Sequence, residues 1–206
     1  MKKLFLPLAL VAVLFTSCND DDSSMVTPEP EPIDQTPTPA QELKLITTSN
    51  TSGKISFTDL LATTPTAKSF TISSTDADGV YYDTFKDQVV LASRTNNRVE
   101  AYNGLRNAII SSATTLDLSF SSLVDFTNAR EIAVSGDKVV VAQDQNAGNG
   151  NLSKFYVYQR NTSGFTLLNT YTVDIKLWGI HLDGTTMYAI ADNTSDLVVY
   201  NNFFSN

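Results

Sequence analysis

The sequence predicts an all-β fold for residues 43–206, on three observations. The region is rich in Val, Thr, Ile, Tyr and Phe, which favour strands. Short runs of alternating apolar and polar residues are separated by Asn, Asp, Gly and Ser, which favour turns. The runs also recur in the same order, and no stretch shows the apolar period of a helix.

Four segments are variants of one β-hairpin, with an apolar strand, a polar turn and a second strand that ends in an aromatic residue. They span residues 44–57, 88–102, 138–158 and 185–200. The closing aromatics are spaced by 45, 56 and 42 residues, and they are Phe57, Tyr102, Tyr158 and Tyr200. The longest interval contains an extra loop, 146–153.

Two further kinds of segment recur with about the same spacing as the hairpins. Alternating segments follow three of the hairpins, at 69–73, 115–119 and 170–174, and a third kind of segment opens each later unit, at 79–83, 130–137 and 178–184. Each full unit therefore has four short antiparallel strands, a to d, in about 45 residues, which is the blade of a β-propeller. A β-sandwich would not keep three markers in register, and β-helix coils are much shorter.

The strand count predicts an incomplete ring. The first unit lacks strand a and the last stops after strand c, which gives 14 strands in the order three, four, four and three. We interpret residues 43–206 as a partial β-propeller from a longer protein. A ragged four-bladed ring or closure by dimerisation is the alternative. An open arc of blades would expose apolar faces and strand edges.

In detail, these repeats resemble the lactonase-like and WD40-like propellers of secreted bacterial proteins, although the WD signature is absent. Propellers usually bind ligands through the start of strand a and the loops around the central channel. In this sequence the corresponding channel or ligand-binding candidates are Asp78, Tyr82, Arg130, Glu131, Trp178 and His181.

Metal and catalytic chemistry find little support in the sequence. His181 is the only histidine, so neither a multi-histidine metal site nor a conventional Ser-His-Asp triad can draw on a second one. Asp76, Asp78 and Gly79 match part of a calcium loop but lack its closing glutamate, so they are assigned to an inter-blade turn. The Gly-rich stretch 146–151 lies between two strands, not before a helix, and is expected to be a hairpin loop. We therefore expect no cofactor and no metal site.

The N-terminus has the pattern of a secretory signal. A positive start is followed by the apolar run from Leu4 to Phe15, which is short for a transmembrane helix. The run ends in Phe15-Thr16-Ser17-Cys18, which resembles the lipobox of bacterial lipoproteins. That resemblance implies cleavage after residue 17 and acylation of Cys18. An ordinary signal peptide cut nearby is the alternative.

The segment after Cys18 is expected to be an acidic, disordered linker. Asn19, Asp20, Asp21 and Asp22 resemble the export signal that sends some Gram-negative lipoproteins to the cell surface, and a solvated spacer is the alternative. Residues 23–42 hold five of the seven prolines and few apolar side chains. The predicted organisation is a signal peptide at 1–17, a linker at 18–42 and propeller blades at 43–206.

The amino-acid composition excludes several kinds of site. The net charge is −8, and the single cysteine excludes an intrachain disulfide and a thiolate zinc site. No basic patch suited to nucleic acid is present. We expect an outer-membrane, lipid-anchored and surface-exposed protein whose propeller binds a protein or a glycan. The alternatives are a lactonase-like or other hydrolytic enzyme with a channel site, and a structural scaffold within a larger lipoprotein.

Overall fold

The computed structural model describes residues 44–124, 128–143, 152–192 and 194–205. These ranges fall within one compact unit, Gln41–Asn206. Their strands form four antiparallel sheets in chain order, and within each sheet the paired strands are consecutive in sequence. This is the strand order of successive propeller blades.

The first two sheets hold seven strands. Sheet 1 contains β1 (Lys44–Thr48), β2 (Lys54–Asp59) and β3 (Ala67–Thr71). Sheet 2 contains β4 (Ala77–Asp83), β5 (Gln88–Ser93), β6 (Arg98–Asn103) and β7 (Leu118–Leu123).

The last two sheets hold the other seven. Sheet 3 contains β8 (Ala129–Ser135), β9 (Lys138–Gln143), β10 (Ser153–Arg160) and β11 (Phe165–Val173). Sheet 4 contains β12 (Leu177–Asp183), β13 (Thr186–Ala191) and β14 (Leu197–Tyr200). The predicted pattern of three, four, four and three strands is thus confirmed for the described residues.

One predicted strand begins later than expected, because its first residues bond to another sheet. The segment 115–119 was expected to start strand d of sheet 2, but β7 begins at Leu118. Upstream of it, the Leu116 N–H donates to the carbonyl of Thr71 (2.9 Å) and the Thr71 N–H donates to the carbonyl of Thr114 (2.8 Å). These bonds join β3 of sheet 1 to the chain that leads into β7.

The expectation of a chain without helix is wrong at one place. Helix α1 (Leu105–Ile110) connects β6 to β7, and a single 3-10 turn, η2 (Phe203–Ser205), follows β14. Leu105 and Ala108 are buried on one side of α1. Six residues make less than two turns, so the helical period never repeats often enough to be recognised in sequence.

The core lies between neighbouring sheets. In β5, Val89 and Leu91 pack toward sheet 1, whereas Val90 and Ala92 pack toward sheet 3. In the same way, β9 divides its side chains between sheets 2 and 4. Both faces of these central strands are buried, which explains why their sequences are almost continuously apolar.

The first and last sheets bury only one face among the described residues. Strands β1 and β14 show the alternating exposure of half-buried strands. On the open face of sheet 4, Ile190 is 49% exposed and Leu197 is 62% exposed. Within the described ranges, no helix is long and apolar enough to cross a membrane.

Candidate functional site

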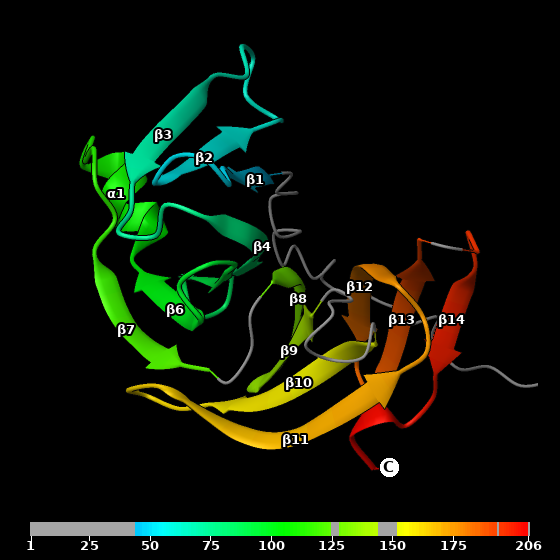
Figure 1. The fold of residues 1–206 in the computed structure, drawn as a ribbon. Coiled ribbons are helices and arrows are strands. Elements are labelled where there is room, and N and C mark those ends of the chain that lie inside the picture. Colours follow the sequence, from blue (N-terminus) through cyan, green and yellow to red (C-terminus); the bar gives the residue numbers. More distant parts are fainter. Residues whose placement is uncertain (1–43, 125–127, 144–151, 193, 206) are drawn as a thin grey trace, which may run out of the picture. The chain divides into compact units, whose positions relative to one another are not determined.

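The first strands of sheets 2, 3 and 4, namely β4, β8 and β12, lie at the inner edges of their sheets, with β8 in contact with both of the others (Figure 1). Each contains a β-bulge near its start. The register skips one residue between Ala77 and Gly79, between Ala129 and Glu131, and between Leu177 and Gly179. The extra residues are Asp78, Arg130 and Trp178. We call the end of the sheets that carries these three residues the bulge end.

The bulge end therefore presents three chemically different side chains from three equivalent backbone positions. Bulges commonly redirect a side chain out of the strand pattern and are frequent beside functional sites. All three residues are predicted from the sequence, because they start strand a of their units. The repeated bulge, which is the reason for their common placement, could not be read from the sequence.

Asp78 lies in a close junction between sheets 2 and 3. Its carboxylate accepts a hydrogen bond from Arg94 Nη1 at 2.9 Å, across the start of its own sheet. The next residue, Gly79, faces the backbone of β8. A Cβ added there would lie 2.6 Å from the Ile132 nitrogen and 2.8 Å from the Glu131 carbonyl carbon. Only glycine permits this approach of the two strands.

Arg130 and Trp178 connect sheets 3 and 4. The Arg130 guanidinium carbon lies 4.2 Å from the centre of the Trp178 ring, a cation–π contact. Trp178 nevertheless remains 52% exposed. The contact fixes the indole on one side while leaving apolar surface available.

Glu131 adds a perturbed carboxyl group to this end. Burial raises its pKa above the ordinary value, and the charge of Asp78 acts in the same direction. A hydrogen bond from the Ile132 N–H at 3.0 Å opposes both effects without cancelling them. The bulge end thus combines two acids, two guanidinium groups and an indole.

The other two predicted residues lie elsewhere. The Tyr82 hydroxyl donates to Asp87 Oδ1 at 2.8 Å, near the far end of β4. His181 is exposed on β12, with its ring centre 6.3 Å from that of Tyr188. It lines a pocket of about 360 Å³ that Glu131 also lines. The structure therefore brings four of the six candidates to the bulge end, joins His181 to Glu131 through this pocket, and separates Tyr82 from the others.

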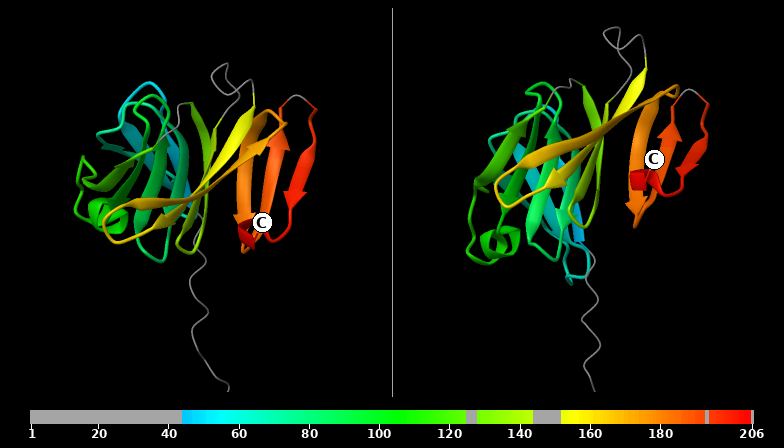
Figure 2. Two further views of the ribbon diagram at one scale, coloured as in Figure 1. Left: turned by 60° about the horizontal axis from the view of Figure 1, so that its bottom comes forward. Right: turned by 90° about the horizontal axis from the view of Figure 1, so that it is seen from below.

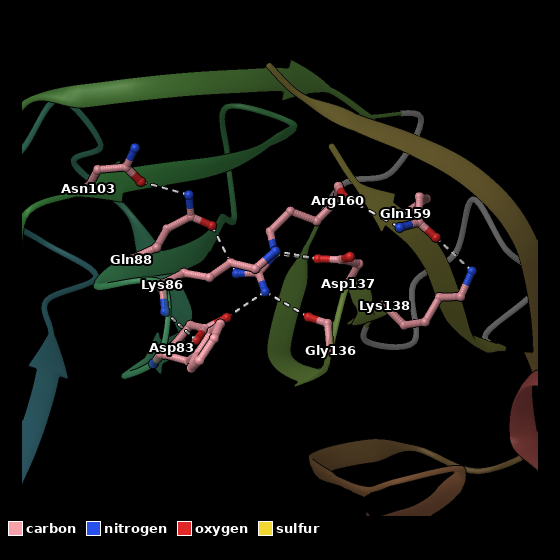
Figure 3. Close-up of polar contacts among 10 residues, drawn as sticks. Asp83, Lys86, Gln88, Asn103, Gly136, Asp137, Lys138, Gln159 and Arg160 are labelled. Carbon is pink, nitrogen blue, oxygen red and sulfur yellow. Dashed lines mark hydrogen bonds and ion pairs between the residues drawn. The ribbon is translucent and has the colours of Figure 1, made fainter. Parts of the chain in front are cut away.

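A second cluster, at the opposite end of sheets 2 and 3, was missed by sequence analysis (Figure 3). Its centre is Arg160, the last residue of β10, whose side chain is only 2% exposed. Arg160 Nη1 donates to Gln88 Oε1 at 2.9 Å, and Nη2 donates to Asp83 Oδ2 at 2.5 Å and to the Gly136 carbonyl at 2.7 Å. Gln88 Nε2 in turn donates to Asn103 Oδ1 at 2.7 Å. We call this set the arginine network.

The only sequence signal for the arginine network was an arginine at the end of an apolar strand. The equivalent position in sheet 2 is Gly104, so the network has no counterpart one repeat earlier. The repeated positions of the sequence therefore do not predict it.

Several predicted features lie outside the described residues, namely Cys18, the export segment Asn19–Asp22, the signal and linker regions, and the Gly-rich loop 146–151. Within the described ranges, no group of three or more His, Cys, Asp and Glu residues could hold a metal ion. In the partial calcium-loop motif, the Asp76 carbonyl accepts the Arg94 N–H at 2.8 Å and the Asp78 carboxylate pairs with Arg94.

No family model and no curated protein matches this sequence. Solved structures do match. A putative 6-phosphogluconolactonase from Bacteroides fragilis NCTC 9343 is 10% identical, with a TM-score of 0.57 over 77% of this chain and 47% of that one. The Cps50 (Swd1) β-propeller domain of Myceliophteria thermophila is 13% identical, with a TM-score of 0.54 over 78% and 50% of the two chains.

A third match is a functionally unknown protein from Desulfotomaculum acetoxidans DSM 771, which is 12% identical with a TM-score of 0.56 over 74% and 49% of the two chains. The present chain thus spans about half the length of these structures. Identities this low establish the fold alone. The described residues form four consecutive blades of a β-propeller, two with four strands and two with three.

Proposed function

We propose that this protein is an interaction module that binds a macromolecular partner through the bulge end. The observation that carries the proposal is the Arg130–Trp178 pair, which two successive bulges bring together with the indole still half exposed. Trp and Arg are the residue types most enriched at the energetic centres of protein interfaces. A rim of Asp78, Arg94 and Glu131 supplies charged groups around that centre.

A protein partner fits this surface better than a small ligand. The indole offers apolar area and the guanidinium offers planar hydrogen-bond donors, and both are held in place before binding, which lowers the entropic cost of association. One matching structure is a chain of the mitotic checkpoint complex, 11% identical with a TM-score of 0.54, so the fold also occurs inside a protein assembly.

Hydrolysis is the second candidate, and Glu131 is the observation that favours it. A carboxyl group with a raised pKa beside another acid is a candidate general acid. Two matching structures are titled putative 6-phosphogluconolactonases. Release of acid from 6-phosphogluconolactone by the purified chain, abolished in Glu131→Gln, would favour the enzyme over the interaction module.

We further propose that the module is tethered to the outer membrane through acylated Cys18 and is exported to the cell surface by the segment Asn19–Asp22. The support is the order of the N-terminal sequence: a positive start, an apolar run, the lipobox-like Phe15–Cys18 and an acidic spacer. Two or more acyl chains would make the anchorage lasting.

Anchorage and export have separate tests. Cells expressing the protein would be labelled with an alkyne analogue of palmitate, and Cys18→Ser should abolish the label. Protease added to intact cells should remove the domain from the wild type but not from a variant with Asn19–Asp22 replaced by Ala and Ser. Palmitate label on the Cys18→Ser protein would contradict anchorage through Cys18. Equal resistance of the wild type and the Asn19–Asp22 variant to protease would contradict export by that segment.

The interaction itself would be tested by cross-linking in intact cells. Trp178→Ala and Arg130→Ala should each remove the cross-linked species that the wild type forms. Phe85→Ala is the matched control, because Phe85 is a 95% exposed aromatic residue in the turn between β4 and β5. Loss of the same species in Phe85→Ala, or its persistence in Trp178→Ala, would contradict binding at the bulge end.

A further inference from the structure

A solvent-open pocket of about 580 Å³ lies beside the arginine network, between sheets 2 and 3 (Figure 3). It is formed where β4 turns into β5, where β8 turns into β9, and where β6 and β10 end. Strand β4 starts at the bulge end and reaches Asp83 at its other end, so this pocket and the Arg130–Trp178 pair lie at opposite ends of the sheets. Figure 2 shows the sheets from the side, with their strands running between these two ends. The volume is within the usual range for small-molecule sites.

Arg160, which lines the pocket, carries a buried donor without a hydrogen bond. Arg160 uses both terminal nitrogens, but its buried Nε makes no hydrogen bond to any described residue. Asp137 Oδ1 lies 4.0 Å from that nitrogen, which is beyond hydrogen-bond length. A buried N–H without an acceptor costs free energy, and a ligand oxygen satisfies this one once the guanidinium turns it toward the pocket.

The charges around the pocket are balanced. Arg160 pairs with Asp83, and Lys86 pairs with Asp137 at the mouth. An anion entering the pocket would meet the Asp137 carboxylate, and a cation would meet the two basic groups. This balance favours a neutral ligand over a phosphate, a carboxylate or an amine.

The remaining lining is rich in amides and contains one aromatic ring. The amides are Gln88, Asn103, Gln159 and Asn161. Amides supply both donors and acceptors, which matches the hydroxyl groups of a neutral polyol. The Phe120 ring is held by Phe165, with ring centres 5.2 Å apart, and adds an apolar surface to the lining.

From the unsatisfied Arg160 donor, the balanced charges, the four amides and the Phe120 ring, we propose that this pocket binds a neutral saccharide unit. The site is separate from the Arg130–Trp178 pair. Its test therefore gives the same answer whether or not the bulge end binds a partner.

The experiment is saturation-transfer NMR and calorimetry on the full chain with the methyl glycosides of glucose, galactose, mannose and N-acetylglucosamine. At least one should bind with a Kd of about 1 mM or tighter. Asn103→Ala should weaken binding about tenfold through loss of a hydrogen-bonding amide. Thr162→Trp, which changes an exposed residue lining the pocket, should block binding by filling it.

The matched control is Asn201→Ala. Asn201 follows Tyr200 as Asn103 follows Tyr102, it is exposed, and it is not among the residues that line the pocket. Its substitution should leave glycoside binding unchanged. Absence of binding for all four glycosides, equal binding by wild type and Thr162→Trp, or displacement of the glycoside by inorganic phosphate would each overturn the proposal.

Discussion

The two ends of the sheets differ in how their side chains are placed. At the bulge end, one backbone feature occurs in three successive strands and presents Asp78, Arg130 and Trp178 from equivalent positions. At the other end, the arginine network occurs once and depends on Arg160, where the preceding repeat has Gly104. At the bulge end the same backbone bulge presents a different side chain in each strand, as expected of a binding surface. The second uses a single buried charge to join two sheets.

The largest expected effect is at the arginine network. Arg160→Met should lower the free energy of unfolding by about 3–5 kcal/mol, because it leaves the Asp83 carboxylate and the Gln88 amide without their buried partner. Urea unfolding followed by circular dichroism would measure it. The control is Lys86→Met, which breaks a pair 41% and 52% exposed and should cost only about 0–1 kcal/mol. An equal loss of unfolding free energy in the two variants would contradict a larger contribution from the buried arginine network than from the exposed Lys86–Asp137 pair.

The second effect tests the close approach of β4 and β8. Gly79→Ala should cost about 1–3 kcal/mol, because the new Cβ would overlap the backbone at Glu131 and Ile132. Gly179→Ala, at the same position of the next sheet, meets only Ile190 Cδ1 at 3.9 Å and should change stability by about 0.5 kcal/mol or less. Thermal unfolding of both variants would decide, and equal melting temperatures would show that the junction is not tight.

The third effect is a loss of stability in acid that depends on protonation of Asp83. Burial alone would raise its pKa, but hydrogen bonds from the Lys86 N–H and from Arg160, together with the Arg160 charge, hold the pKa below its ordinary value of 3.8. The contribution to stability is therefore present above that value and is lost as pH falls through the lower folded-state pKa. Urea midpoints from neutral pH to about pH 2 should fall more steeply for the wild type than for Asp83→Asn. Parallel curves would contradict the assignment.

The smallest effect has the opposite sign and lies at the bulge end. Because burial and the Asp78 charge raise the pKa of Glu131, its ionised form is disfavoured in the folded protein. Stability from this group is present below the ordinary pKa of 4.5 and is lost as pH rises through the folded-state value. Glu131→Gln should therefore stabilise the protein at neutral pH, with the gain vanishing near pH 4 in urea titrations. A loss at neutral pH would show that the carboxylate is needed for folding.

Much of the fold could be predicted from the sequence because it depends on repetition. The hairpins at 44–57 and 88–102 share an apolar strand, a turn and a closing aromatic, and each forms the expected strand pair. Helix α1 was missed because six residues carry too little periodicity. The late start of β7 was missed because Leu116 bonds to a strand of another sheet, which local preferences do not reveal.

Part of the candidate site was also predictable from the sequence. Arg130 and Trp178 were predicted from their position at the start of strand a. Their stacking depends on two β-bulges, which the residue types at these positions do not predict. Tyr82 lies further along β4, away from the bulge end, and His181 lies further along β12, where it lines a pocket with Glu131. Arg160 was not predicted, because its role depends on contacts with Asp83 and Gln88, more than 70 residues away in sequence.

The most direct test of the account is to measure folding stability and partner cross-linking together for Trp178→Ala. Trp178 is half exposed and is presented by a bulge, so we expect the urea midpoint to stay within experimental error of the wild type while the cross-linked species disappears. A large drop in the midpoint with undiminished cross-linking would contradict it, because the indole would then stabilise the fold and the bulge end would not be the binding surface.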